Sequence, residues 1–153
     1  MGTLSIATSG LSAASLRLDV TASNIANALT TGPLPAADGS NASGAGNSNS
    51  TGNSNGSSNF SAYVPLQVNQ VDQTNGPEAG GTSAVVSTVT PSYVPQYDSG
   101  SPFANQDGLV AAPNVDLATQ FVQLLTAKYS FAANAKVIQA YANTTKSLLD
   151  ITV

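Results

Sequence analysis

The chain has 153 residues, a formal net charge of -4, and neither cysteine nor histidine. The lack of both residue types excludes disulfides, thiolate nucleophiles, histidine-based proton transfer and the usual zinc ligands, so we predict no metal site and no cofactor. The four basic residues are Arg17, Lys128, Lys136 and Lys146, and residues 18–127 contain none, which argues against a nucleic-acid partner. No apolar run is long enough to predict a transmembrane span.

An apolar heptad pattern begins near the N-terminus and predicts a long helix. Bulky residues and small residues alternate at steps of three and four, at Leu4, Ala7, Leu11, Ala14, Leu18, Thr21, Ile25 and Ala28. Gly32 and Pro33 are typical of a helix end, so we expect Gly32 to act as the C-cap. The pattern predicts an N-terminal coiled-coil helix within residues 1–32.

The next segment has a different composition and predicts no secondary structure. Residues 36–59 are dominated by glycine, serine and asparagine and have no bulky apolar side chain. This composition is typical of a flexible linker, which we assign to residues 33–59. Asn-x-Ser/Thr triplets occur in it, but chance explains them in a stretch so rich in these residues.

Residues 60–112 read as a small β or extended region. Two apolar, β-branched patches, at 63–71 and 84–90, are separated by the turn signals Asn75-Gly76-Pro77 and Gly80-Gly81, which predicts a hairpin or short sheet. The stretch around Pro95 is expected to continue as an extended arm, because proline limits strands to sheet edges. Asp107-Gly108 predicts a tight turn before the last helix.

A second heptad pattern fills the C-terminal segment 113–153. Its positions are Leu117, Phe121, Leu124, Lys128, Phe131, Ala135, Ile138, Ala142, Thr145 and Leu149. We expect Asn114 to cap this helix and Asp116 to lie near the positive end of its dipole. A helix of this length is too long for a domain of this size, so it needs partners along its length. The fold class is therefore α+β, with long terminal helices pairing as a coiled coil.

Three groups of residues make the chain resemble the flagellar axial proteins, and in particular the small rod proteins of the basal body. The first is Ala22-Ser23-Asn24-Ile25-Ala26-Asn27-Ala28 at the end of the N-terminal helix. The second is Pro113-Asn114-Val115-Asp116 with Tyr129 and the segment 132–135. The third runs from Tyr97-Asp98 through Asp107-Gly108-Leu109-Val110 and is similar to proximal-rod subunits, which usually have tyrosine where Leu109 stands.

The resemblance implies a structural subunit whose terminal helices pair and stack with those of neighbours to form the rod wall around the export channel. Its implied partners are copies of itself, other flagellar rod proteins and the flagellar export apparatus, with no nucleic acid and no small-molecule substrate. Its implied location is the periplasmic rod of the basal body, reached without a cleaved signal peptide. The expected subunit-interface residues lie on the two heptad patterns: Leu4, Leu11, Leu18, Asn24, Ile25, Asn27, Leu117, Phe121, Leu124, Phe131, Asn134, Ile138 and Leu149. Asn24, Asn27 and Asn134 are candidates for interhelical hydrogen bonds that fix register.

Two other functions remain open at this point. A secreted coiled-coil oligomer could use its polar middle segment to bind a surface glycan or partner. An enzyme is the weaker alternative, because the eight acidic residues are scattered and no pair has a spacing that defines a catalytic dyad. We therefore predict no catalytic residue.

Overall fold

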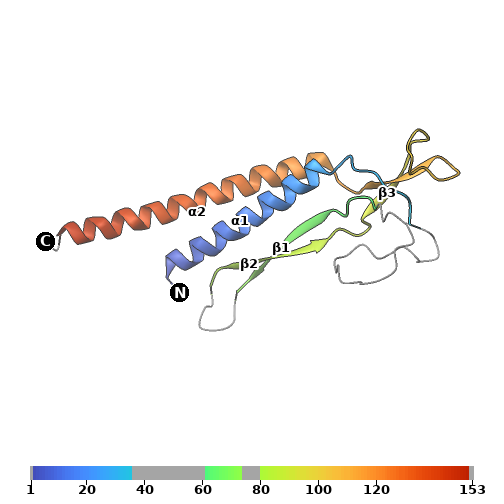
Figure 1. The fold of residues 1–153 in the computed structure, drawn as a ribbon. Helices are drawn as coiled ribbons and strands as arrows, with labels where there is room; N and C mark the ends of the chain where they lie inside the picture. Colours follow the sequence, from blue (N-terminus) through green and yellow to red (C-terminus); the bar gives the residue numbers. More distant parts are fainter. Residues whose placement is uncertain (1, 36–60, 74–79, 152–153) are drawn as a thin grey trace, which may run out of the picture. The chain divides into compact units, whose positions relative to one another are not determined.

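The computed structural model describes residues 2–35, 61–73 and 80–151. The predicted flexible segment 36–59 and the predicted turn at 75–77 lie outside the described residues. The chain forms two compact units, each built from several stretches of sequence. Unit 1 contains Met1–Ala26, Leu66–Thr88 and Val115–Val153, and unit 2 contains Asn27–Pro65 and Val89–Asn114. Two long helices near the chain ends and a small β region between them agree with the predicted architecture (Figure 1).

Unit 1 is built on two long helices that pack against each other. Helix α1 spans Thr3–Ala26 and helix α2 spans Leu117–Ile151. They run antiparallel and side by side (Figure 1). At about 1.5 Å per residue, α1 is roughly 36 Å long and α2 roughly 52 Å. Helix α1 ends six residues before Gly32, so the prediction that Gly32 caps this helix, with Ala28 inside it, is wrong.

The N-terminus of α2 is capped by a different residue from the one expected. The carboxylate of Asp116 accepts hydrogen bonds from Ala118 N at 3.0 Å and Thr119 Oγ1 at 2.5 Å, which satisfies one free amide of the first turn. Asn114, the predicted cap, instead donates from Nδ2 to Pro91 O at 2.9 Å. Its backbone N donates to Ser92 O at 3.0 Å. Asn114 therefore fixes the chain to the loop ahead of the second hairpin.

A hairpin completes unit 1 and packs on α1. Strand β1, Leu66–Asp72, pairs antiparallel with β2, Thr82–Thr88, as the sequence predicts for this region. Gly80 and Gly81 have φ angles of 106° and 121°, which only glycine adopts without strain. An added Cβ at Gly81 would lie 2.6 Å from Ser9 Oγ, so the hairpin approaches α1 closely there. Ser9 Oγ accepts a hydrogen bond from Thr82 N at 3.2 Å.

Unit 2 contains a second hairpin that the sequence reading missed. Strand β3, Tyr93–Tyr97, pairs with β4, Leu109–Pro113, where we expected only an extended arm. The prediction missed β3 because Pro95 interrupts its pattern, yet Pro95 is tolerated in a two-stranded sheet that has only edge strands. Gly108 has a φ of 74°, in agreement with the predicted Asp107-Gly108 turn.

Gly32 has a structural role in unit 2 instead of a capping role. It forms an isolated β-bridge with Ala111 through two backbone hydrogen bonds of 3.0 and 2.8 Å. An added Cβ would lie 2.3 Å from Ala62 N, so only glycine fits between these two backbone segments. Val110 and Ala111 are almost fully buried and form the centre of this unit. None of the described helices has the length and apolar character needed to cross a membrane.

Candidate assembly surface

The two helices of unit 1 hold one constant register, which two separate contacts define. Asn24 Nδ2 on α1 donates to Gln120 Oε1 on α2 at 3.1 Å. About four helical turns away, a Cβ added to Gly10 would lie 2.7 Å from Asn134 Nδ2 of α2. The residue numbers of both pairs have the same sum, as an antiparallel pair without slippage requires. Asn24 and Asn134, both predicted register residues, therefore lie at the contact between the helices of one chain.

Asn24 joins three elements at once. Its side chain is 1% exposed, and besides Gln120 it bonds both backbone groups of Leu66, the first residue of β1. Nδ2 donates to Leu66 O at 2.7 Å, and Oδ1 accepts from Leu66 N at 3.0 Å. A buried amide is stable only when its polar atoms are paired in this way. Asn24 thus fixes the end of α1, the start of α2 and the start of the hairpin together.

On α1 the small positions of the heptad pattern make the closest contacts. Ala7, Ala14 and Thr21 are buried, seven residues apart. The bulky positions Leu11, Leu18 and Ile25 are half-buried, and Leu4 is exposed. Asn27, another predicted residue, lies just after the helix, is half-buried and accepts a hydrogen bond from Thr30 N through its carbonyl oxygen. Small buried side chains allow the two helix backbones to approach closely.

On α2 the line of residues that faces α1 differs from the predicted one. The buried residue is Ala127, with 0% exposure, whereas Phe121 is 54% exposed and Lys128 is exposed. The positions that are not fully exposed are 120, 124, 127, 130, 134, 135 and 138. The predicted positions 121 and 128 are exposed, and the residues just before them, 120 and 127, face α1 instead. Leu124 and Ile138 belong to both lines and are half-buried, while Leu117 and Phe131 remain exposed at 40% and 37%.

The last part of α2 extends past its partner helix. In the observed register Thr3, the first residue of α1, lies opposite position 141. Every residue from 139 to 151 is exposed, over a length of about 20 Å. The segment includes Tyr141, Leu148, Leu149 and Ile151, the last two at 65% and 81% exposure. We call residues 139–151 the projecting segment.

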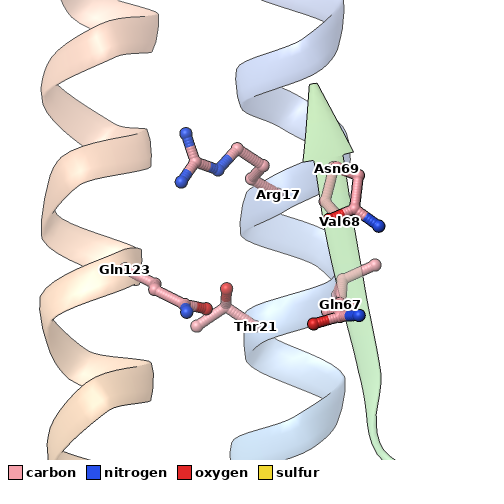
Figure 2. Close-up of a pocket in the computed structure, with 7 residues that line it drawn as sticks. Arg17, Thr21, Gln67, Val68, Asn69 and Gln123 are labelled. Carbon is pink, nitrogen blue, oxygen red and sulfur yellow. The ribbon is translucent and has the colours of Figure 1, made fainter. Parts of the chain in front are cut away.

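A polar pocket lies where α1, α2 and β1 meet. It has a volume of about 240 Å³ and is lined by Arg17, Val20, Thr21, Gln67, Val68, Asn69 and Gln123. Figure 2 shows Arg17 reaching from α1 toward α2, with Gln123 of α2 pointing at Thr21. Arg17 is half-buried, and it forms no ion pair with any residue in the described part of the chain. The pocket therefore holds a positive charge that no neighbouring carboxylate balances.

The carboxylate that caps α2 is stabilised by its own hydrogen bonds. Hydrogen bonds from Thr119 and from the amide of Ala118 hold the pKa of Asp116 below its ordinary value, because they stabilise the carboxylate. Within residues 2–35, 61–73 and 80–151, no group of three or more acidic side chains could hold a metal ion.

The sequence reading missed the residues that complete the helix contact. Gln120, Ala127 and Gly10 were absent from the predicted set, because none of them lies on either predicted heptad pattern. The small side chains of Gly10 and Ala127 were the one sequence signal of a close helix contact. Gln120 gave no such signal, because a glutamine at a helix contact is indistinguishable in sequence from one on a solvated face.

Comparison with known proteins identifies the family. The family model for flagella basal body rod proteins matches residues 4–33, which contain α1. The model for the C-terminal part of the flagellar basal body rod FlgEFG proteins matches residues 106–151, which contain β4 and α2. The chain belongs to the flagellar basal-body rod proteins.

Within that family the chain is similar to FlgC. It is 36% identical over 149 residues to the flagellar basal-body rod protein FlgC of Salmonella typhimurium, covering 94% of this chain and 88% of the relative. It is 35% identical to FlgC of Yersinia enterocolitica over the same shares of the two chains. FlgC of Agrobacterium fabrum is 27% identical, over 95% and 90%. The resemblance to proximal-rod proteins is confirmed, and the chain is a structural subunit of the basal-body rod.

Proposed function

We propose that this rod subunit polymerises through its two terminal helices, which pair as a coiled coil with helices of neighbouring copies and of other rod proteins. The assembled helices form the drive shaft and the wall of the export channel between the rotor base and the hook. The chain reaches the periplasmic rod through the flagellar export apparatus. The relatives that it matches are structural rod proteins.

The observation that carries the proposal is the projecting segment. Four large apolar side chains there are between 49% and 81% exposed, and covering a leucine or isoleucine is worth about 1.5–3 kcal/mol each. Phe121, Val122, Leu125 and Tyr129 extend this exposed apolar surface along the paired part of α2. Large exposed apolar surfaces on a helix are typical of a protein–protein interface.

The predicted interface residues divide into two groups under this proposal. Exposed side chains are available to neighbours in the assembly: Leu4, Leu117, Phe121, Phe131 and Leu149. The half-buried or buried ones support the helix pair of one chain and contribute at their remaining exposed edges: Leu11, Leu18, Asn24, Ile25, Asn27, Leu124, Asn134 and Ile138.

Hydrogen exchange on the purified chain, alone and mixed with the other rod proteins, tests the proposal. We expect amides of residues 139–151 to exchange rapidly alone and to become protected on mixing, whereas amides around Ala127 change little. Leu149→Asp should abolish the new protection, and the matched surface variant Asn143→Asp should retain it. Protection of the segment in the isolated chain, or no change on mixing, would contradict the proposal.

A further inference from the structure

We infer that the pocket around Arg17 is the receptor for the projecting segment of a second copy of this chain, with Asp150 of that copy as the carboxylate that pairs with Arg17. The inference rests on the proposed function and names one of its contacts. It starts from two incomplete features of the same molecule, a pocket with an unbalanced cation and a helix end with uncovered apolar side chains.

The chemistry of the pocket favours a carboxylate. Arg17 offers a planar guanidinium, which binds a carboxylate through two parallel hydrogen bonds. Gln67, Asn69 and Gln123 add amide groups to the lining, and Val20 and Val68 contribute apolar surface to it. A pocket of this kind accepts an acidic side chain together with a neighbouring apolar one. Its volume of about 240 Å³ suits one or two side chains.

Asp150 is the acidic residue that meets these requirements among the described acids. It is the one acidic residue of the projecting segment, and it lies between Leu149 and Ile151, which are both highly exposed. Asp116 already caps α2, and Asp98 accepts a hydrogen bond from Gly100 N in its own turn. Asp19 and Asp72 belong to α1 and β1, the elements that form the pocket itself.

The contact has to form between chains. Gln123 lines the pocket and Asp150 lies on the same straight helix 27 residues later, a separation of about 40 Å. Docking therefore joins two different surfaces of two copies. Such a heterologous contact leaves one free pocket and one free helix end on every pair, so it can be repeated from copy to copy, into a ring if the rotation closes and into an open helical assembly if it does not.

Single-cysteine cross-linking tests the contact directly, because the natural chain has no cysteine. A Gln67→Cys chain is mixed with an Ile151→Cys chain under oxidising conditions, and disulfide-linked dimers are measured. We expect a dimer of the two different chains that exceeds the dimers formed by either variant alone. Val85→Cys, an exposed position on β2 outside the pocket, is the matched control and should not cross-link to Ile151→Cys. Equal yields from positions 67 and 85 would overturn the inference.

Exchanging the charges of Arg17 and Asp150 tests whether these two residues pair. Arg17→Asp in the pocket chain or Asp150→Arg in the helix-end chain should each lower the cross-link yield about fivefold, the equivalent of roughly 1 kcal/mol for an ion pair. Combining the two should restore the yield, and Arg17→Lys should retain most of it. Asp150→Arg lies on an exposed helix end, so it keeps the test valid if Arg17→Asp disturbs folding. Failure of both the decrease and the rescue would refute the pairing.

The proposed function is checked separately by asking whether the epitope-tagged natural chain co-purifies with basal bodies. If it does while the charge exchange has no effect, the pocket inference fails and the rod function stands. If the natural chain does not co-purify, the rod assembly proposal itself fails.

Discussion

The two parts of α2 differ in how their apolar residues are used. Up to Ile138 the helix packs on α1, and its closest contact is made by Ala127, a small residue with no exposed surface. From residue 142 onward the helix extends past α1, and large side chains such as Leu148 and Leu149 are exposed. The comparison teaches that small residues and one polar junction hold the subunit together, while bulky apolar residues remain on its surface for neighbours.

In the paired part of α2, the largest effect on stability should come from removing the hydrogen bonds of Asn24 to Gln120 and Leu66. Asn24→Ala leaves both backbone groups of Leu66 and the amide of Gln120 without this partner in a buried place. We expect the free energy of unfolding to fall by about 2–4 kcal/mol, since each buried unpaired group costs about 1–3. Urea unfolding followed by circular dichroism measures this. Asn143→Ala, on the projecting segment, should change it by less than about 0.5 kcal/mol, and equal effects at the two positions would contradict the role of Asn24.

A bulkier side chain should change the stability differently in the two parts of α2. Ala127→Leu forces a larger group between α1 and α2 and should destabilise the monomer by about 1–3 kcal/mol. Ala142→Leu makes the same change on the projecting segment, where nothing in the described chain lies against it, and should be neutral. The same urea titrations compare them. A neutral Ala127→Leu variant would mean that the helices do not pack in the observed register.

The smallest effect should come from the α2 cap, and it depends on pH. Because folding lowers the pKa of Asp116, its charged cap contributes stability above the unfolded pKa of about 3.8, and this is lost as the pH falls through the lower folded pKa. Asp116→Asn keeps an oxygen acceptor without the charge. We therefore expect the free energy of unfolding of the variant to fall less than that of the natural chain between about pH 5 and 2. Parallel pH profiles for both proteins would show that the carboxylate contributes nothing.

The existence of the two helices could be predicted from the sequence, because heptad periodicity is local. Their ends could not, since α1 ends six residues before Gly32 and Asp116, not Asn114, caps α2. The line of α2 that faces α1 could not. Leu124, Phe131 and Ile138 fit two heptad lines equally well, and the bulky Phe121 made the wrong line look more apolar than the line through Ala127. The choice between them depends on α1, whose Gly10 and Asn24 lie against Asn134 and Gln120.

The candidate site was predictable to a smaller extent. The resemblance of segment 22–28 to the rod proteins pointed to Asn24 as an important residue. The hydrogen bonds of Asn24 to Leu66 link positions 42 residues apart, which no local pattern encodes. The pocket around Arg17 combines three elements from distant parts of the chain, so it became visible only in the fold. The second hairpin was missed because Pro95 interrupts the strand pattern of β3, and the strand that pairs with it, β4, follows only after a loop.

The unequal lengths of α1 and α2 have a mechanical consequence. If the projecting segment lies beside the middle of the next subunit, the end of one helix never meets the end of another in a single plane across the shaft. The contacts between helix ends in such a shaft are staggered along its length. A continuous helix of a neighbouring subunit spans each of them. Twisting loads then act along the hydrogen-bonded length of a helix, where the chain is stiff, and no single cross-section consists only of contacts between subunits.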